Sequence, residues 1–136
     1  MFAAVVHCVE ISNEGLVCIC DREGNRIQVF TKQGEFIRNI WIPEGAAETP
    51  DVLGNAWSMD FSADSEQRYL FVMDGLNERV HIIENASGEA VGMFGRSGHA
   101  AGDFDFGHTI SVDSQGNIYV AETGEGRRIQ RFTPSN

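Results

Sequence analysis

The apolar residues of this chain alternate with polar ones over short runs, and most runs end at Gly, Asn, Asp or Pro. A spacing of two places successive side chains on opposite faces of a β-strand, whereas a helix needs apolar residues three and four apart. No segment carries a helical pattern of useful length. The pattern therefore predicts an all-β fold with strands at 5–12, 15–21, 26–32, 36–42, 56–62, 68–74, 79–85, 88–95, 108–114, 117–123 and 127–133.

One segment occurs three times, each time directly after or within an apolar strand pattern. It reads CDREGNRIQVF from Cys20, MDGLNERVHII from Met73 and AETGEGRRIQRF from Ala121. A unit of about 40–50 residues built from short strands is typical of β-propeller blades. We therefore predict three antiparallel four-stranded blades, the third incomplete because its outer strand is missing. Their predicted bounds are 1–44, 54–96 and 104–136.

Three blades do not close a propeller ring, which typically needs about 4–8. The first and third blades would each leave one face without a neighbouring blade, and such bare faces and unpaired edges favour association. Symmetric dimers are the commonest soluble oligomers. We therefore expect a two-fold homodimer in which two copies, each half of a six-bladed β-propeller, complete one ring.

The chain is strongly acidic, with 20 Asp and Glu against 10 Lys and Arg, a formal net charge of −10 and a pI near 4.7. Nucleic acids and anionic membranes are bound by concentrated basic surfaces. Neither class of partner is therefore expected. Cations and basic peptides are the better candidates.

The three cysteines, Cys8, Cys18 and Cys20, form an odd number without a recognised paired spacing. This argues against a disulfide framework and for a reducing compartment. Cys18 and Cys20 share one strand face, and either a thiolate metal site or small buried side chains would account for them. The N-terminal MFAAVVHCVE lacks a basic region and is too short for a membrane span. Together these features predict a cytoplasmic protein.

The repeated segment resembles the repeat of the NHL family, in which a strand is followed by Asp, a short polar turn and Asn-Arg-Ile-Gln-x-Phe. NRIQVF at 25–30 fits this pattern, RRIQRF at 127–132 is close to it, and ERVHII at 78–83 diverges from it. The resemblance covers nearly the whole chain. It implies a six-bladed propeller, of which this chain is about half.

The repeated arginines stand five or six residues after an acidic residue. An arginine at this position can reach the carboxylate of its own or a neighbouring blade and form a bidentate pair. We therefore expect a structural role for three acid and arginine sets. His81 occupies the place of Gln28 and Gln130 and belongs to the same sets. The expected pairs are Asp21 with Arg26, Asp74 with Arg79, and Glu122 with Arg128.

Within this family the chain resembles the C-terminal half of bacterial relatives of peptidyl-α-hydroxyglycine α-amidating lyase. The resemblance rests on HCVEISNEGLVCICD from His7 and HTISVDSQGNIYVAE from His108, which align residue for residue, with Trp57 in the aligned place between them. It implies that His7 and His108 reach the central channel and bind zinc there. Two histidines are too few for a firm zinc site. A two-fold dimer would present four around one axis, or a missing N-terminal half would supply a third.

Other residues carry weaker signals. His99 lies in a Gly-rich loop, where it is either a rim contact or an ordinary exposed side chain. Asp103 and Asp105 could ligate calcium through oxygen, or finish a loop over packed phenylalanines. The lyase resemblance also implies a catalytic Tyr and Arg, but Tyr69 and Tyr119 lie on second strands and fit packing roles.

These observations support a self-associating NHL-repeat module that acts as a ligand- or protein-binding scaffold, with a divalent metal, zinc or calcium, at its central channel. The alternative is a zinc-dependent enzyme of the amidating-lyase type, or an inactive fragment of one. The scaffold needs only the repeats. The enzyme also needs converging histidines, a metal and a base.

Overall fold

The computed structural model describes residues 1–43 and 53–135, so the segment directly after the first predicted blade lies largely outside the described residues. All regular elements of the described part are strands, which confirms the predicted all-β class. The strands are β1 (Val6–Ile11), β2 (Val17–Asp21), β3 (Arg26–Phe30), β4 (Phe36–Trp41), β5 (Ser58–Phe61), β6 (Tyr69–Asp74), β7 (Arg79–Glu84), β8 (Ala90–Phe94), β9 (Gly107–Val112), β10 (Ile118–Glu122) and β11 (Ile129–Phe132). Within the described ranges, no helix has the length and apolarity needed to cross a membrane.

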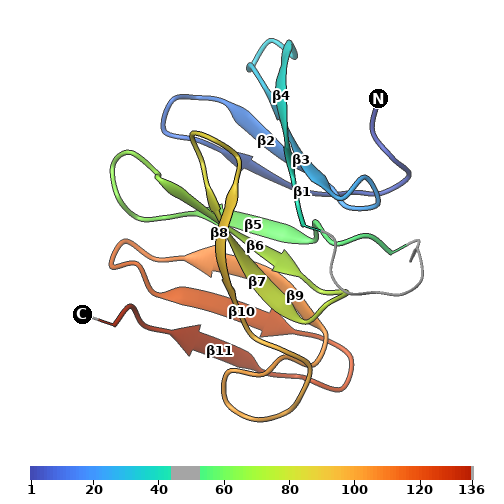
Figure 1. Ribbon diagram of the computed structural model, residues 1–136, viewed down its shortest axis with the longest axis vertical. Coiled ribbons are helices and arrows are strands. Elements are labelled where there is room, and N and C mark those ends of the chain that lie inside the picture. Colours follow the sequence, from blue (N-terminus) through green and yellow to red (C-terminus); the bar gives the residue numbers. More distant parts are fainter. Residues whose placement is uncertain (44–52, 136) are drawn as a thin grey trace.

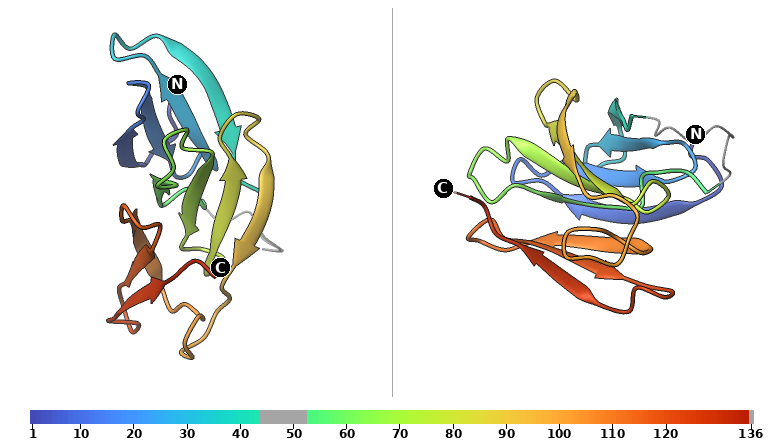
Figure 2. Two further views of the ribbon diagram at one scale, coloured as in Figure 1. Left: turned by 90° about the vertical axis from the view of Figure 1, so that its left-hand side faces the viewer. Right: turned by 60° about the horizontal axis from the view of Figure 1, so that its bottom comes forward.

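The strands form three antiparallel sheets in chain order, which we call blades 1, 2 and 3 (Figure 1). Blade 1 has the order β1-β2-β3-β4 and blade 2 the order β5-β6-β7-β8. Among the described residues, blade 3 consists of β9, β10 and β11, without an outer fourth strand. Figure 2 shows from two further directions that blade 2 lies between the other two. The fold is therefore a partial β-propeller.

The core consists of two apolar layers, one on each side of blade 2. Cys18, Cys20 and Ile27 of blade 1 pack with Leu70 and Val72 of blade 2 in the first layer. The second layer joins the opposite face of blade 2 to blade 3. Its buried members are Met73, Val80, Phe104, Ile110, Ile118 and Val120. The period of two along each strand thus sends alternate side chains into different layers.

In blades 1 and 3 the acidic residue of the repeat anchors the segment that enters the same blade. In blade 1 the Asp21 carboxylate accepts hydrogen bonds from Arg26 Nε at 2.8 Å, Gln28 Nε2 at 2.9 Å and the backbone amide of Ala3 at 2.9 Å. Arg26 also donates to the carbonyl oxygen of Met1. Burial acts to raise the pKa of Asp21, but these hydrogen bonds outweigh it and hold that pKa below its ordinary value.

Blade 3 repeats the arrangement with a glutamate. Glu122 accepts from Arg128 Nε at 2.9 Å, from Gln130 Nε2 at 2.6 Å and from the backbone amide of Asp105 at 2.9 Å. Arg128 also donates to the carbonyl oxygen of His99. The acid, arginine and glutamine therefore hold the incoming chain at the start of the inner strand.

Blade 2 departs from the arrangement. Its buried Asp74 lies 3.0 Å from His81 Nε2 and accepts from the backbone and side chain of Asn77. Arg79 instead directs its Nε to the carbonyl oxygen of Asn77 and one terminal nitrogen to the sulfur of Met93. The described residues therefore show ion pairs of Asp21 with Arg26 and of Glu122 with Arg128. The expected pair of Asp74 with Arg79 is not among them, and Asp74 is instead contacted by His81, from the place that Gln28 and Gln130 hold in the other blades.

Cys8 and Cys20 form a disulfide, which corrects the expectation of free thiols and removes the cysteine argument for a reducing compartment. The register of β1 and β2 places the two residues directly opposite each other, with their Cα atoms 4.8 Å apart. This separation lies within the range that a disulfide requires. Cys18 remains free and buried, and burial raises the pKa of its thiol to about 11.

The disulfide predicts a specific pattern of thiol reactivity. Denatured, unreduced protein should react with an alkylating reagent at Cys18 alone, whereas all three cysteines should react after reduction. Reduction should lower the free energy of unfolding by about 2–3 kcal/mol, because the cross-link restricts the unfolded chain. Mass spectrometry counts the alkylated sites, and a Cys18→Ser variant should show none before reduction. Alkylation of all three cysteines without reductant would contradict the pairing.

The anchoring role of Asp21 is tested by Asp21→Asn. The substitution removes the buried negative charge beside Arg26 and replaces one of the two acceptor oxygens with an amide donor, so we expect a loss of about 3–5 kcal/mol in the free energy of unfolding. The control is Glu125→Gln, since Glu125 makes only an exposed contact with Arg127, and it should leave the urea midpoint unchanged. Equal midpoints for both variants would show that Asp21 does not anchor the blade.

Candidate functional site

Three aromatic side chains from the three inner strands gather at one end of the blades. His7 lies near the start of β1, Trp57 directly precedes β5, and His108 lies near the start of β9. The ring centroids of His7 and His108 are 5.1 Å apart, and each lies 5.4–5.7 Å from the Trp57 ring. The structure therefore brings together the two predicted histidines, although 101 residues separate them in the sequence.

A hydrogen bond sets the tautomer of His7. Its Nδ1 lies 2.5 Å from the backbone carbonyl oxygen of Trp57. A carbonyl oxygen only accepts, so Nδ1 carries the proton of the neutral ring and Nε2 keeps its lone pair. Metal-bound histidines commonly hold their second nitrogen in this way.

Trp57 is buried and held on every side. Its Nε1 donates to the carbonyl oxygen of Gly54 at 2.8 Å, and the Phe106 ring meets it edge-on at 5.4 Å. The Arg22 guanidinium lies 5.0 Å from its centroid, an arrangement typical of a cation–π contact. A Cβ at Gly75 would come within 2.7 Å of the indole, so only glycine leaves room for the ring. Trp57 is thus a rigid wall beside both imidazoles.

The surroundings of His108 favour its neutral form. Burial lowers the pKa of His108 most, and the neighbouring His7 and Arg22 lower it further. Arg22 Nε is buried without a hydrogen-bond partner in the described structure. The site therefore combines two imidazoles with a guanidinium that has an unused donor.

The donor set matches part of a zinc site. Neutral imidazole nitrogens suit zinc, which usually takes three or four protein ligands. His7 and His108 supply two, and the described residues contain no group of three or more His, Cys, Asp or Glu side chains placed to hold a metal. The other ligands would have to come from outside the described residues.

The remaining candidate residues lie elsewhere. Asp103 accepts from Arg96 at 2.9 Å, and Asp105 lies 3.4 Å from His99 Nδ1, so these two carboxylates have different side-chain partners in the loop before β9. The Tyr119 hydroxyl lies 3.2 Å from Asp113, away from the histidines. Calcium binding at this loop stays a prediction.

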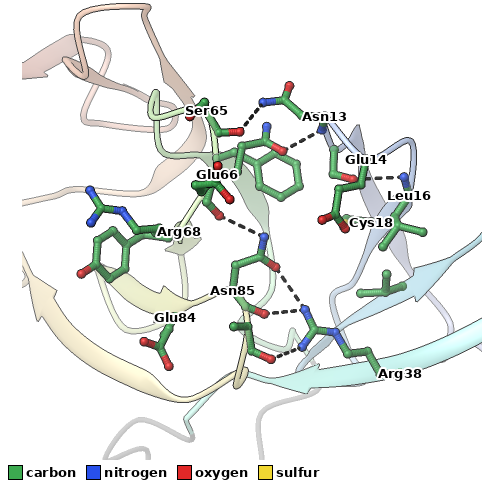
Figure 3. Close-up of a pocket in the computed structure, with 16 residues that line it drawn as sticks. Asn13, Glu14, Leu16, Cys18, Arg38, Ser65, Glu66, Arg68, Glu84 and Asn85 are labelled. Atoms are coloured by element: carbon green, nitrogen blue, oxygen red, sulfur yellow. Dashed lines mark hydrogen bonds between the residues drawn. The ribbon is translucent and has the colours of Figure 1, made fainter.

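Sequence reasoning missed a cleft between blades 1 and 2, at the opposite end of the inner strands (Figure 3). Its volume is about 510 Å³. Arg38 spans it and donates to the backbone carbonyl oxygens of Asn85 and Ala86. Asn13 links the first hairpin loop to that of blade 2 through Ser65. Because the Arg38 guanidinium is bound to these carbonyl oxygens, we interpret the cleft as a hydrogen-bonded contact between blades 1 and 2.

Curated relatives of the chain include the two that follow, while no family model matches the chain. The chain is 26% identical over 126 residues to peptidyl-glycine alpha-amidating monooxygenase B of Xenopus laevis, covering 92% of this chain and 14% of that protein. It is 29% identical over 141 residues to NHL repeat-containing protein 3 of Homo sapiens, covering 97% of this chain and 36% of that protein. The chain thus spans about a third or less of these relatives.

Solved structures share the fold at lower identity. Virginiamycin B lyase of Staphylococcus aureus matches with a TM-score of 0.64 and 16% identity, over 97% of this chain and 42% of that one. Hydrazine synthase of Kuenenia stuttgartiensis matches with a TM-score of 0.66 and 12% identity, over 91% of this chain and 31% of that one. Taken together, the repeats, the three-bladed architecture and these relatives support a β-propeller of the NHL type, at low identity.

Proposed function

We propose that this propeller scaffold self-associates and binds a divalent metal ion, zinc first, at the channel end of its blades through His7 and His108. The observation that supports the proposal most strongly is the 5.1 Å approach of the two imidazoles from blades that are not neighbours in sequence. The hydrogen bond on His7 Nδ1 leaves Nε2 as the nitrogen available to a metal, and the lowered pKa of His108 favours its neutral ring. A second copy would contribute the same pair to the channel and enlarge the donor set.

The chemistry of such a centre depends on what accompanies the metal. A bound zinc ion with an open position polarises a substrate oxygen or lowers the pKa of a bound water. Around it, this chain offers the Arg22 guanidinium, which can hold an anionic group, and the Trp57 wall, which excludes water on one side. These features fit a ligand that carries a carboxylate or a similar anion.

A lyase activity of the amidating type is the second candidate. The similarity to peptidyl-glycine alpha-amidating monooxygenase B favours it, together with the arginine beside the histidine pair. Neither tyrosine supports it, because Tyr69 lines the distant cleft and Tyr119 contacts Asp113. An enzyme of this type should release glyoxylate from a peptidyl-α-hydroxyglycine. A fully zinc-loaded sample that releases no glyoxylate would instead be a metal-binding scaffold.

The metal proposal predicts a zinc content that depends on both histidines. Protein purified without a histidine tag and dialysed against buffered zinc should retain the metal. Inductively coupled plasma mass spectrometry measures the zinc content. His7→Ala and His108→Ala should each weaken zinc binding by at least about tenfold, since either removes a ligand. His99→Ala is the matched control, because His99 is an exposed loop side chain. Equal zinc contents in all four proteins would refute the site.

The same site predicts a pH dependence. Protons compete with zinc for the imidazole lone pairs, so binding should weaken as the pH falls. The lowered pKa of His108 means that this ring is protonated only below the ordinary histidine value of 6.5, so its contribution should persist below that pH. Calorimetric titration of zinc between pH 5 and 8 measures the profile. Affinity that rises towards pH 5, or does not change, would contradict ligation by neutral histidine.

A further inference from the structure

Blade 1 has one face that no other part of the described chain covers in full. The apolar residues of this face stand at repeat positions whose equivalents in blades 2 and 3 are buried. Val9 and Ile11 of β1 are 60% and 51% exposed. By repeat alignment they correspond to Met59 and Phe61 of blade 2, which are 0% and 5% exposed, and Val9 also to Ile110 of blade 3, at 6%. In blades 2 and 3 these positions pack on the preceding blade. The open face of blade 1 therefore has the composition of a surface that receives a blade.

Blade 3 has the complementary open face. Its side chains occupy the positions that blades 1 and 2 turn towards the next blade, as the strand register shows. They are small or amphipathic, apart from the exposed Ile129. The members of this face are Thr109, Ser111, Tyr119, Ala121, Ile129 and Arg131.

We propose that the open face of blade 3 in one copy of this chain docks on the open face of blade 1 in a second copy, twice, so that two copies close one ring of six blades. This inference specifies the self-association in the proposed function, and only its consequence for metal binding rests on that proposed function. Ring closure would bring the histidine pairs of both copies to one channel. The occupant is a second copy because the chain itself supplies both halves of the interface.

Contacts between the inner strands of blades 2 and 3 show how such an interface is bonded. The backbone amide of Ile110 donates to Ser58 Oγ at 3.3 Å, and that of Val112 donates to the Asp60 carboxylate at 2.7 Å. Each blade thus presents oxygen acceptors to the inner strand of the next.

The open faces preserve this pattern. Thr109 and Ser111 occupy the places of Ser58 and Asp60, while Val9 and Ile11 occupy those of Ile110 and Val112. The Ser12 amide donates to the carbonyl oxygen of Leu16, so by the alternation of antiparallel pairs the amides of Val9 and Ile11 point away from β2. In the docked pair these amides donate to Thr109 Oγ1 and Ser111 Oγ of the other copy.

A turn residue supplies a further contact between consecutive blades. Asn25 and Glu78, both at positive φ, stand at the same place in the β2–β3 and β6–β7 turns. Asn25 Oδ1 accepts from the amide of Asn55, and Glu78 accepts from the amides of Phe106 and Gly107. Each side chain holds the entry of the following blade.

The third turn has Arg127 at this place, with φ of 48°, and its guanidinium has no acceptor. Its present contacts are exposed ones, to Gly124 and Glu125. The docked pair therefore lacks the third contact, and its association is weaker than the internal blade contacts and depends on concentration. An asparagine at 127 would tolerate the positive φ and restore the acceptor.

The experiment is multi-angle light scattering across a dilution series. Wild-type protein should move from a mass of about twice 15.0 kDa towards 15.0 kDa on dilution. Val9→Asp should give only the 15.0 kDa species, because a charge enters the apolar interface. Arg127→Asn should lower the dissociation constant of the dimer. Thr109→Val should raise this constant about fivefold, because valine lacks the hydroxyl, whereas Thr109→Ser keeps the hydroxyl and should not raise it.

Val91→Asp is the matched control for the charge, because Val91 is 57% exposed on the outer strand of blade 2, away from both open faces. It should keep the wild-type mass. Circular dichroism confirms that each variant is folded. A monomer at all concentrations, open-ended oligomers beyond two copies, or a dimer that Val9→Asp leaves intact would overturn the interface. A dimer without zinc would refute only the metal, and zinc bound to a monomer would refute only the interface.

Discussion

The structure depends on the burial of one blade face against the next. A single sheet of three or four short strands cannot bury its own apolar side chains, because successive residues of each strand point to opposite faces. Blade 2 buries apolar side chains on both of its faces, in one layer towards blade 1 and another towards blade 3. Blades 1 and 3 each bury apolar side chains on one face only. The proposed association follows from this unequal burial.

The acidic residue of the repeat gives the blades their common geometry. Asp21 and Glu122 each gather an arginine, a glutamine and the amide of the incoming chain, and so fix where the inner strand begins. That fixed start places His7 and His108 at the same level of the inner strands of blades 1 and 3. A structural motif that is repeated for stability therefore also positions the candidate metal ligands, and the Trp57 wall holds their rings in place.

The sequence predicted the features that follow from periodicity. Strand alternation and the repeated acid and arginine predicted the all-β blades and the incomplete third blade, whereas the approach of His7 to His108 was implied by the lyase resemblance. It did not predict the Cys8–Cys20 disulfide, because the pairing arises from the register of β1 and β2 and not from the spacing of the cysteines. It did not predict the roles of Asn25 and Glu78 either, since contacts between blades depend on how far one turn reaches towards the next sheet.

The most direct test of the account is hydrogen–deuterium exchange of the amides in β1, followed at high and at low protein concentration. We expect the amides of Val9 and Ile11 to exchange slowly when the protein is concentrated and rapidly when it is dilute, while those of Ile110 and Val112 stay protected at both. Rapid exchange of Val9 and Ile11 at every concentration would contradict the claim that the open face of blade 1 is covered by a second copy.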